Sequence, residues 1–165
     1  MKRYEINSSL QSISPAETSL GYSYWNYCLP PFCPETTLIL GAGQGTIEKL
    51  IRNNWGKDIE IVSVDLNPPA HYIMDASEYV KRDIKYDYVV VDIHDGTGHP
   101  DWIFSEEFVS DLARITTKLL SINVLGKAKD MSFYDTYFDF ELEKTILDNK
   151  IYFYKAKDNK DNYFL

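Results

Sequence analysis

The chain has 165 residues, a length typical of one globular domain that buries roughly two-thirds of its unfolded surface. Its formal net charge is -8, with 25 acidic residues (Asp and Glu) against 17 basic residues (Lys and Arg). Because nucleic-acid backbones are bound by clustered lysine and arginine, this balance argues against a nucleic-acid partner; it fits a cationic substrate, or an acidity that serves only solubility.

Targeting and redox signals are weak in this sequence. No basic leader with an apolar core and a cleavage site opens the chain, and no apolar run reaches the length of a membrane span, so we expect a cytoplasmic protein without a membrane partner. Cys28 and Cys33 are too few for a disulfide framework and lack the partner pairs of a zinc site. We expect two reduced packing cysteines and no metal.

Residues 1–34 form an N-terminal segment that differs from residues 35–165, which we expect to be the domain proper. The segment is aromatic between Gly21 and Tyr27 and is followed by Pro30 and Pro31. Two interpretations stay open for it: a lid that covers a pocket, and plain packing against the domain.

From residue 35 onward the sequence alternates between strand-like and helix-like patterns, as in an α/β fold. Strands are predicted at 37–41, 59–65, 71–74, 86–93, 119–124, 140–147 and 150–156. Helices are predicted at 45–54, 76–82, 104–116 and 130–137. The run 88–91 is apolar on both faces, which is typical of a parallel strand between two helix layers. Asp148 and Asn149 are predicted to form the tight turn of an antiparallel C-terminal hairpin.

The segment 38–45 joins an apolar strand to a glycine-rich turn ahead of a helix. Glycines at 41, 43 and 45 allow a sharp turn and a close approach of the backbone to a ligand, and the next helix offers free amide donors. This pattern is typical of nucleotide-type cofactor sites, although a tight turn can need the same glycines for packing alone.

A second strand ends in a carboxylate, Asp65, about twenty residues after the glycine turn. Its two oxygens can accept hydrogen bonds from both hydroxyls of a ribose, while the simpler interpretation is a turn residue before Asn67. Thr46 occupies the place where dinucleotide sites usually have their third glycine, which disfavours NAD or FAD. A nucleoside without phosphate, such as S-adenosylmethionine, fits better.

The strand at 86–93 leads into Asp92, His94 and Asp95 at the edge where open α/β folds bind ligands. The two aspartates could face one cation together. A carboxylate that holds an ammonium group and accepts its proton would prepare an amine for nucleophilic attack on a sulfonium carbon. If the strand persists, His94 points to the opposite face, where we expect a structural histidine.

These segments together resemble the spermidine synthase branch of the class I methyltransferase fold. The resemblance covers most of residues 36–125 and rests on 38–45, 62–65, 86–100 and 103–108. Two details are specific to this branch. Most methyltransferases have an acidic residue at the position of Ile39, whereas the aminopropyltransferases have an aliphatic one. The segment from Asp92 to Phe108 also resembles theirs, with two aspartates three residues apart, a gate loop and the start of a helix. It implies an α/β, Rossmann-like fold, with a mostly parallel sheet and helices on both faces.

The resemblance also implies roles for residues on the substrate side. Asp92 matches the aspartate that helps deprotonate the attacking amine, and Asp95 matches the one that helps hold the polyamine. Tyr24 falls near a tyrosine that faces the substrate. These three are the catalytic candidates.

On the cofactor side, Asp65 matches the carboxylate that binds ribose, and Asp75 with Ala76 matches the contact to the adenine amino group. The further cofactor candidates surround these positions: Gly41, Gly43, Gln44, Gly45, Leu66 and Asp92. The implied cofactor is S-adenosylmethionine or its decarboxylated form.

The sequence departs from the family in three ways. The family's N-terminal β-domain and longer C-terminal region have no counterpart here, and the stretch from Asp65 to Asp75 is too short for the usual helix. Gln44 stands where synthases have an aspartate that repels the carboxylate of intact S-adenosylmethionine. A neutral amide no longer enforces the choice between the two donors.

Three functional hypotheses follow. The chain transfers an aminopropyl or methyl group to a small amine, or it is a small-molecule methyltransferase with another acceptor, or it is a noncatalytic nucleoside-binding subunit. A homodimer is expected on general grounds, because two-fold dimers are the commonest soluble assemblies.

Overall fold

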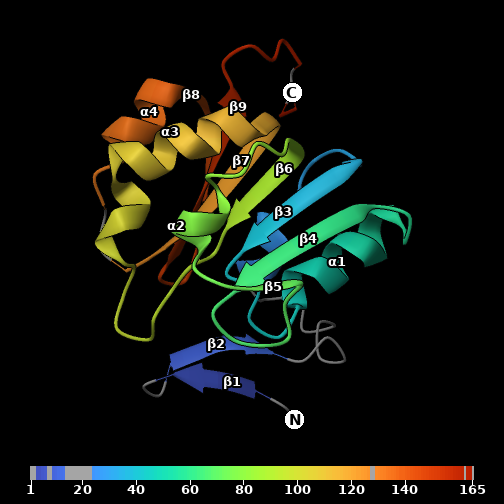
Figure 1. The fold of residues 1–165 in the computed structure, drawn as a ribbon, viewed down its shortest axis with the longest axis vertical. Helices are drawn as coiled ribbons and strands as arrows, with labels where there is room; N and C mark the ends of the chain where they lie inside the picture. The colour runs from blue at the N-terminus through green and yellow to red at the C-terminus, as the bar shows by residue number, and fades with distance from the viewer. Residues whose placement is uncertain (1–2, 7–8, 14–23, 127–128, 162, 165) are drawn as a thin grey trace.

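A computed structural model describes residues 3–6, 9–13, 24–126, 129–161 and 163–164 of the chain. Its centre is a seven-stranded sheet with the order β5-β4-β3-β6-β7-β9-β8 (Figure 1). The first five of these strands in that order run parallel, and their bounds are β3 Thr36–Leu40, β4 Glu60–Asp65, β5 Tyr72–Ile73, β6 Tyr86–Val91 and β7 Thr116–Leu125. The predicted mostly parallel α/β sheet is confirmed.

The sheet ends in an antiparallel hairpin, as predicted, formed by β8 (Phe138–Ile146) and β9 (Asn149–Ala156). Its turn lies one residue earlier than predicted. Ile146 pairs with Asn149, so the loop is Leu147 and Asp148, and Leu147 takes a positive φ of 52°. The sequence pattern favoured Asn149 for this role because asparagine tolerates that conformation better than leucine.

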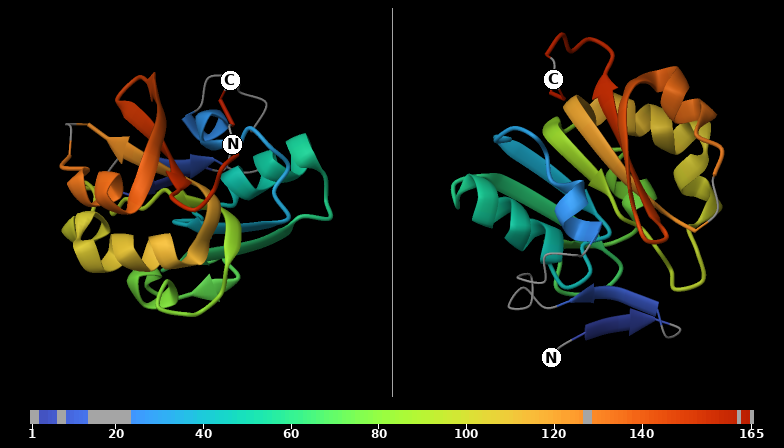
Figure 2. Two further views of the ribbon diagram at one scale, coloured as in Figure 1. Left: turned by 90° about the horizontal axis from the view of Figure 1, so that it is seen from above. Right: turned by 180° about the vertical axis from the view of Figure 1, so that it is seen from behind.

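Helices cover both faces of the sheet (Figure 2). One face carries α1 (Thr46–Trp55) and the 3-10 helix η2 (Tyr24–Cys28), and the other carries α2 (Ala76–Tyr79), α3 (Glu106–Ile115) and α4 (Ser132–Tyr137). Neighbouring residues of β3 contribute to opposite cores, since Leu38 and Leu40 pack with α3 while Ile39 packs with α1. Both faces are therefore buried, as expected of central parallel strands.

The helix predicted at 104–116 is two elements in the structure, the 3-10 helix η3 (Asp101–Phe104) and α3. Ser105 separates them in an extended conformation, and its hydroxyl accepts a hydrogen bond from the amide of Phe108. A serine N-cap satisfies a backbone donor that the first turn of a helix leaves unpaired, so a new helix starts here. None of the helices in the described ranges is long and apolar enough to cross a membrane.

The N-terminal segment contains a feature that the sequence analysis did not predict. Strands β1 (Arg3–Ile6) and β2 (Ser9–Ile13) form an antiparallel hairpin, which lies beyond the carboxyl ends of β3 and β4 in Figure 1. Within η2, Trp25 and Cys28 are buried in the same core as α1. This burial favours packing against the domain for η2, while the lid interpretation of residues 1–34 stays a prediction; Gly21 to Ser23 lie outside the described residues.

The two cysteines are free thiols. Cys28 is fully buried, as expected of a packing residue, whereas Cys33 is exposed, so that prediction was wrong for Cys33. Its thiol lies 3.8 Å from the carbonyl oxygen of Trp55, at the end of α1. The sequence did not reveal this because Cys33 sits between prolines in a segment without periodicity.

The turn after β3 gives the first testable prediction. Gly41 and Gly56 both have a φ that side chains rarely adopt, 88° and 108°, so alanine at either position adds backbone strain of about 1–3 kcal/mol. At Gly41 the new Cβ would also overlap the carbonyl oxygen of Asp92, whereas at Gly56 no described atom lies within 4 Å. Gly41→Ala should therefore lower the free energy of unfolding by roughly 1–3 kcal/mol more than Gly56→Ala in urea denaturation. Equal losses would contradict this close approach.

Candidate functional site

A cavity of about 310 Å³ opens at the carboxyl ends of β3, β4 and β6. Its wall combines apolar side chains with four aspartates, and no lysine or arginine is among the described residues that line it. The lining residues are Gly41, Gly43, Val64, Asp65, Leu66, Asn67, Met74, Asp75, Ala76, Asp92, Ile93, His94, Asp95, Pro100 and Trp102. Cavities at this edge of open α/β sheets are the usual ligand sites.

Asp65 closes the floor of the cavity next to the glycine turn. Its Oδ2 accepts a hydrogen bond from the amide of Gly43 at 2.9 Å, and its Oδ1 accepts one from the amide of Asn67 at 2.9 Å. Each carboxylate oxygen can accept more than one hydrogen bond, so acceptor capacity remains for a diol. The turn thus fixes the orientation of the side chain that the sequence analysis assigned to ribose.

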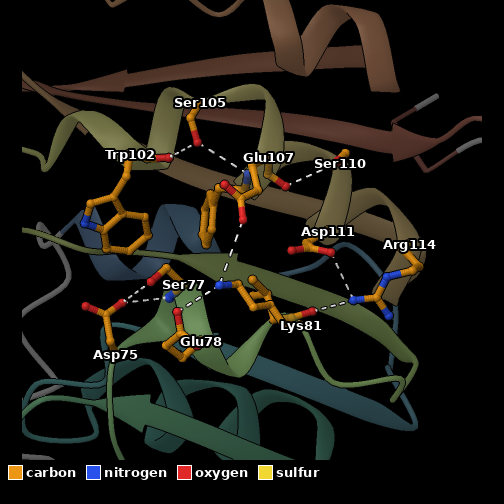
Figure 3. Close-up of polar contacts among 12 residues, drawn as sticks. Asp75, Ser77, Glu78, Lys81, Trp102, Ser105, Glu107, Ser110, Asp111 and Arg114 are labelled. Carbon is orange, nitrogen blue, oxygen red and sulfur yellow. Dashed lines mark hydrogen bonds and ion pairs between the residues drawn. The ribbon is translucent and has the colours of Figure 1, made fainter.

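Asp75 stands at the start of α2 and acts as its N-cap. Its Oδ1 accepts hydrogen bonds from the amide and the hydroxyl of Ser77, at 2.8 and 2.7 Å (Figure 3). Ala76 and the exposed side chain of Leu66 line the same part of the cavity. Trp102, on η3, completes this wall and packs edge-on against Phe108.

Polar contacts between α2 and α3 hold that wall in place. Lys81, which follows α2, forms an ion pair with Glu78 of that helix, and its Nζ lies 3.9 Å from a carboxylate oxygen of Glu107 in α3 (Figure 3). Arg114 donates to the carbonyl oxygen of Val80 and pairs with Asp111. Because exposed ion pairs contribute little individually, we assign these contacts to orientation rather than to stability.

Asp92 is held by side-chain hydrogen bonds at both of its carboxylate oxygens. Its Oδ1 accepts a hydrogen bond from the side-chain amide of Asn123 at 2.9 Å, and its Oδ2 accepts one from the hydroxyl of Tyr24 at 3.0 Å. The pKa of Asp92 is raised to about 6: burial is the main cause, the nearby charge of Asp65 adds to it, and the two hydrogen bonds act in the opposite direction. Asp92 is therefore mostly ionised at pH 7, yet close enough to neutrality to exchange a proton.

Asp95 differs from Asp92 in its surroundings. It is exposed, and its Oδ1 accepts hydrogen bonds from the amide and hydroxyl of Thr97 and from the amide of Gly98. These bonds lower its pKa to about 2, so it is fully ionised at neutral pH. Asp95 closes the turn that begins the loop after β6 and presents a permanent negative charge to the cavity.

His94 does not point away from the two aspartates as predicted, although its Nδ1 accepts a hydrogen bond from the amide of Gly96, as expected of a structural histidine. His94 lines the cavity, because β6 ends at Val91 and the alternation of strand side chains no longer applies to it. His99 is a structural histidine: it is buried, its Nδ1 lies 2.7 Å from the carbonyl oxygen of Ile93, and its Nε2 accepts a hydrogen bond from the amide of Leu125. His99 therefore ties the loop to the end of β7, and burial lowers its pKa.

The structure brings most predicted site residues together and leaves two aside. Gln44 and Gly45 are not among the residues that line the cavity, and Tyr24 reaches the site through its bond to Asp92. Sequence reasoning missed Trp102 and Asn123; the signal for Asn123 was a single amide within the apolar run of β7. No group of three or more residues able to hold a metal ion occurs in the part of the chain that the structure describes.

Comparisons with known proteins agree on the fold. No protein-family model matches the chain, and no curated protein matches it significantly. Among solved structures, human methyltransferase-like protein 13 in complex with SAH aligns with a TM-score of 0.65 at 16% identity, covering 78% of this chain and 75% of that one. A Burkholderia thailandensis N-methyltransferase that acts on 1,6-didemethyltoxoflavin, solved with S-adenosylhomocysteine, aligns with a TM-score of 0.59 at 13% identity over 74% and 71% of the two chains.

A spermidine synthase in complex with the transition-state analogue AdoDATO also aligns, with a TM-score of 0.57 at 17% identity. The alignment covers 86% of this chain but only 62% of the synthase. Identities this low establish the architecture and leave the reaction open. The strand order, the two helix layers and these alignments show that the chain has the Rossmann-like fold of class I S-adenosylmethionine-dependent methyltransferases.

Proposed function

We propose that this protein is a transferase that binds S-adenosylmethionine or a related sulfonium nucleoside and moves an alkyl group to a small amine. The observation that carries the proposal is the pairing of two aspartates in one cavity: Asp65, oriented by the glycine turn, and Asp92, a desolvated carboxylate with a pKa of about 6. The first suits a ribose, and the second suits an amine that must lose a proton.

The residues of the cavity fit the nucleoside. Asp65 would accept from the ribose hydroxyls, and the second carboxylate oxygen of Asp75, which does not cap α2, would accept from the adenine amino group. Leu66, Ala76 and Trp102 supply apolar surface for a flat ring. Bound S-adenosylmethionine would supply an electrophilic carbon and a thioether leaving group.

The negative charge of the cavity supports the binding of two cationic groups, the sulfonium of a donor and the ammonium of an acceptor. Four aspartates line it and no described lysine or arginine does, so sulfonium and ammonium groups are attracted and anionic acceptors are repelled. After transfer the sulfur is neutral, which weakens the attraction and favours release of the product nucleoside. This argument supports an amine rather than a carboxylate or phosphate acceptor.

Asp92 and Asp95 have distinct tasks in the proposed reaction. Asp95 keeps its charge at neutral pH and holds a distal ammonium group. Asp92 would accept the proton of the attacking ammonium, which frees the nitrogen lone pair to form the new nitrogen–carbon bond; the bound donor would supply the carbon and would keep the electrons of the broken carbon–sulfur bond on sulfur. With a pKa of about 6, Asp92 is ionised at pH 7 and is a suitable general base.

A second candidate is methyl transfer from the intact donor to another small molecule. It is favoured by the methyltransferases among the structural neighbours. Gln44 does not discriminate between the two donors, because it is not among the residues that line the cavity. Aminopropyl transfer is favoured by the acidic cavity and by the alignment with spermidine synthase. The two candidates differ in the donor they require.

Thermal unfolding with each donor separates these candidates. A ligand that binds only the folded state stabilises it by about 2.7 kcal/mol at a hundred times its Kd, so a clear rise in Tm is expected with at least one of the two donors. Greater stabilisation by the decarboxylated donor favours aminopropyl transfer, and greater stabilisation by S-adenosylmethionine favours methyl transfer. Asp65→Ala should abolish the shift. The absence of a shift with either donor would overturn the proposal.

The role of Asp92 can be tested by Asp92→Asn. Loss of the general base should reduce transfer by about 10²–10⁴-fold, while the Tm shift produced by the nucleoside is retained, because Asp65 and Asp75 are unchanged. Turnover is measured with a diamine acceptor and the donor selected by the binding experiment. Undiminished turnover in this variant would exclude Asp92 as the base.

The same variant gives a stability test that needs no substrate. An unfolded Asp92 ionises near pH 4, whereas the folded protein keeps its proton until about pH 6, so ionisation destabilises the wild-type fold as pH rises from 4 to 6. Asp92→Asn should therefore gain on the order of 1–3 kcal/mol over the wild type at pH 8, and this gain should vanish at pH 4.

Asp95→Asn is the control for that experiment, since the folded pKa of Asp95 is lowered to about 2. Its ionisation stabilises the fold above pH 4, so this variant should lose stability relative to the wild type as pH rises, with the opposite sign to Asp92→Asn. A difference between Asp92→Asn and the wild type that does not depend on pH would contradict the assignment.

A further inference from the structure

Asn123 is an unusual residue near the carboxyl end of β7. Its neighbours Leu119, Leu120, Ile122 and Val124 are buried and apolar, and Asn123 itself is only 5% exposed. A buried amide costs free energy unless its donor and its acceptor are both hydrogen-bonded. The contacts of this side chain therefore show what it does.

Only half of this amide is satisfied. Its Nδ2 donates to Oδ1 of Asp92 at 2.9 Å, while its Oδ1 has no hydrogen-bond partner in the part of the chain that the structure describes. A leucine at this position would fill similar space without an unpaired acceptor, so packing alone does not account for an asparagine. What the amide adds is a single hydrogen bond to Asp92.

The opposite oxygen of Asp92 is held in a matching way. Tyr24, from η2, donates its hydroxyl to Oδ2 at 3.0 Å, so neutral donors from β7 and from the N-terminal segment hold the two carboxylate oxygens. Two donors on different oxygens fix the plane of a carboxylate and leave its remaining lone pairs for a ligand. Asp92 is the member of this trio that lines the cavity.

We propose that Asn123 is a positioning residue for Asp92, which keeps the carboxylate oriented and ionised for a cationic ligand in the cavity. This inference rests on the proposed function for its purpose, although its physical content, the state of Asp92, can be measured without a substrate. Asn123 itself does not have to touch the substrate.

The groups around Asp92 determine whether the loss of Asn123 raises or lowers the pKa of this carboxyl. Burial and the charge of Asp65 raise its pKa, and the hydrogen bonds from Asn123 and Tyr24 lower it. Burial also raises the pKa of the Tyr24 hydroxyl and of the Cys28 thiol, so both stay neutral at pH 7. Removing the amide of Asn123 should therefore raise the pKa of Asp92, because one of the two bonds to its charged form is lost.

The test is an NMR titration of the Asp92 side-chain carboxyl carbon in the full chain, assigned by comparison with Asp92→Asn. In Asn123→Leu the pKa should rise by roughly one unit, since a hydrogen bond to a charged group is lost. At pH 5, where Asp92 is protonated, the variant should unfold at or above the wild-type Tm. Ser121→Ala is the matched control, because Ser121 lies on the same face of β7 and bonds to Tyr88 instead of Asp92. It should leave the pKa of Asp92 unchanged.

Once a donor and an acceptor are identified, turnover gives a second readout. The acid limb of the pH profile should move up by the same unit in Asn123→Leu, which reduces turnover about five-fold at pH 6. Asn123→Gln, which keeps the amide, should restore part of the loss. Failure to find any turnover would count against the proposed function and leave the titration result standing.

An unchanged pKa of Asp92 in Asn123→Leu would overturn the inference. If that variant does not fold, Asn123→Ala is titrated in its place, with the same expected rise. Failure of both variants to fold would show that the amide is part of the packing of β7, and would also overturn it.

Discussion

The close approach of the β3 turn to the end of β6 is the constraint on which the site depends. Hydrogen bonding on both sides of β3 continues to its last residue: the amide of Asp92 donates to the carbonyl of Leu40, and the amide of Gly41 donates to the carbonyl of Val64. The chain must then turn at once, against the carbonyl of Asp92, where a Cβ does not fit. This geometry brings Asp65 and Asp92 to one cavity, and their mutual repulsion helps raise the pKa of Asp92.

Buried polar groups near the cavity fall into two kinds. The hydroxyl of Tyr88 donates to the carbonyl of Cys28 and lies 2.6 Å from the Ser121 hydroxyl, and His99 is bonded at both ring nitrogens, so these groups are satisfied and hold η2 and the loop after β6 in place. Asp92 and Asn123 are not optimised for stability, because the first is a desolvated charge and the second has an unpaired acceptor. Buried groups that reduce the stability of the fold in this way are found most often at functional sites.

The sequence predicted the sheet and many of the residues that line the cavity, because both depend on local pattern. The spacing of apolar residues indicates which side chains of a segment are buried. Glycines and an aspartate at fixed spacing indicate a turn and the end of a strand. Contacts between distant segments leave no such pattern. The bond from Asn123 to Asp92 spans 31 residues, and the role of His99 depends on the amide of Leu125, 26 residues away. The predicted direction of the His94 side chain was wrong because alternation was extended past the true end of β6.

The short connection between β4 and α2 explains why the cavity is open near Leu66. No helix is described between β4 and β5, and side chains add to the pairing of the two-residue β5 with β4: Nδ1 of His71 lies 2.8 Å from the Ser63 hydroxyl, and Arg82 stacks on Tyr72 and Tyr79. Leu66 consequently stays 66% exposed at the mouth of the cavity. An open apolar wall contributes less to binding than a closed one, because less surface leaves water. Under the proposed function, recognition of a nucleoside would therefore depend more on hydrogen bonds to Asp65 and Asp75, whose side chains are oriented by backbone amides, than on burial of the base.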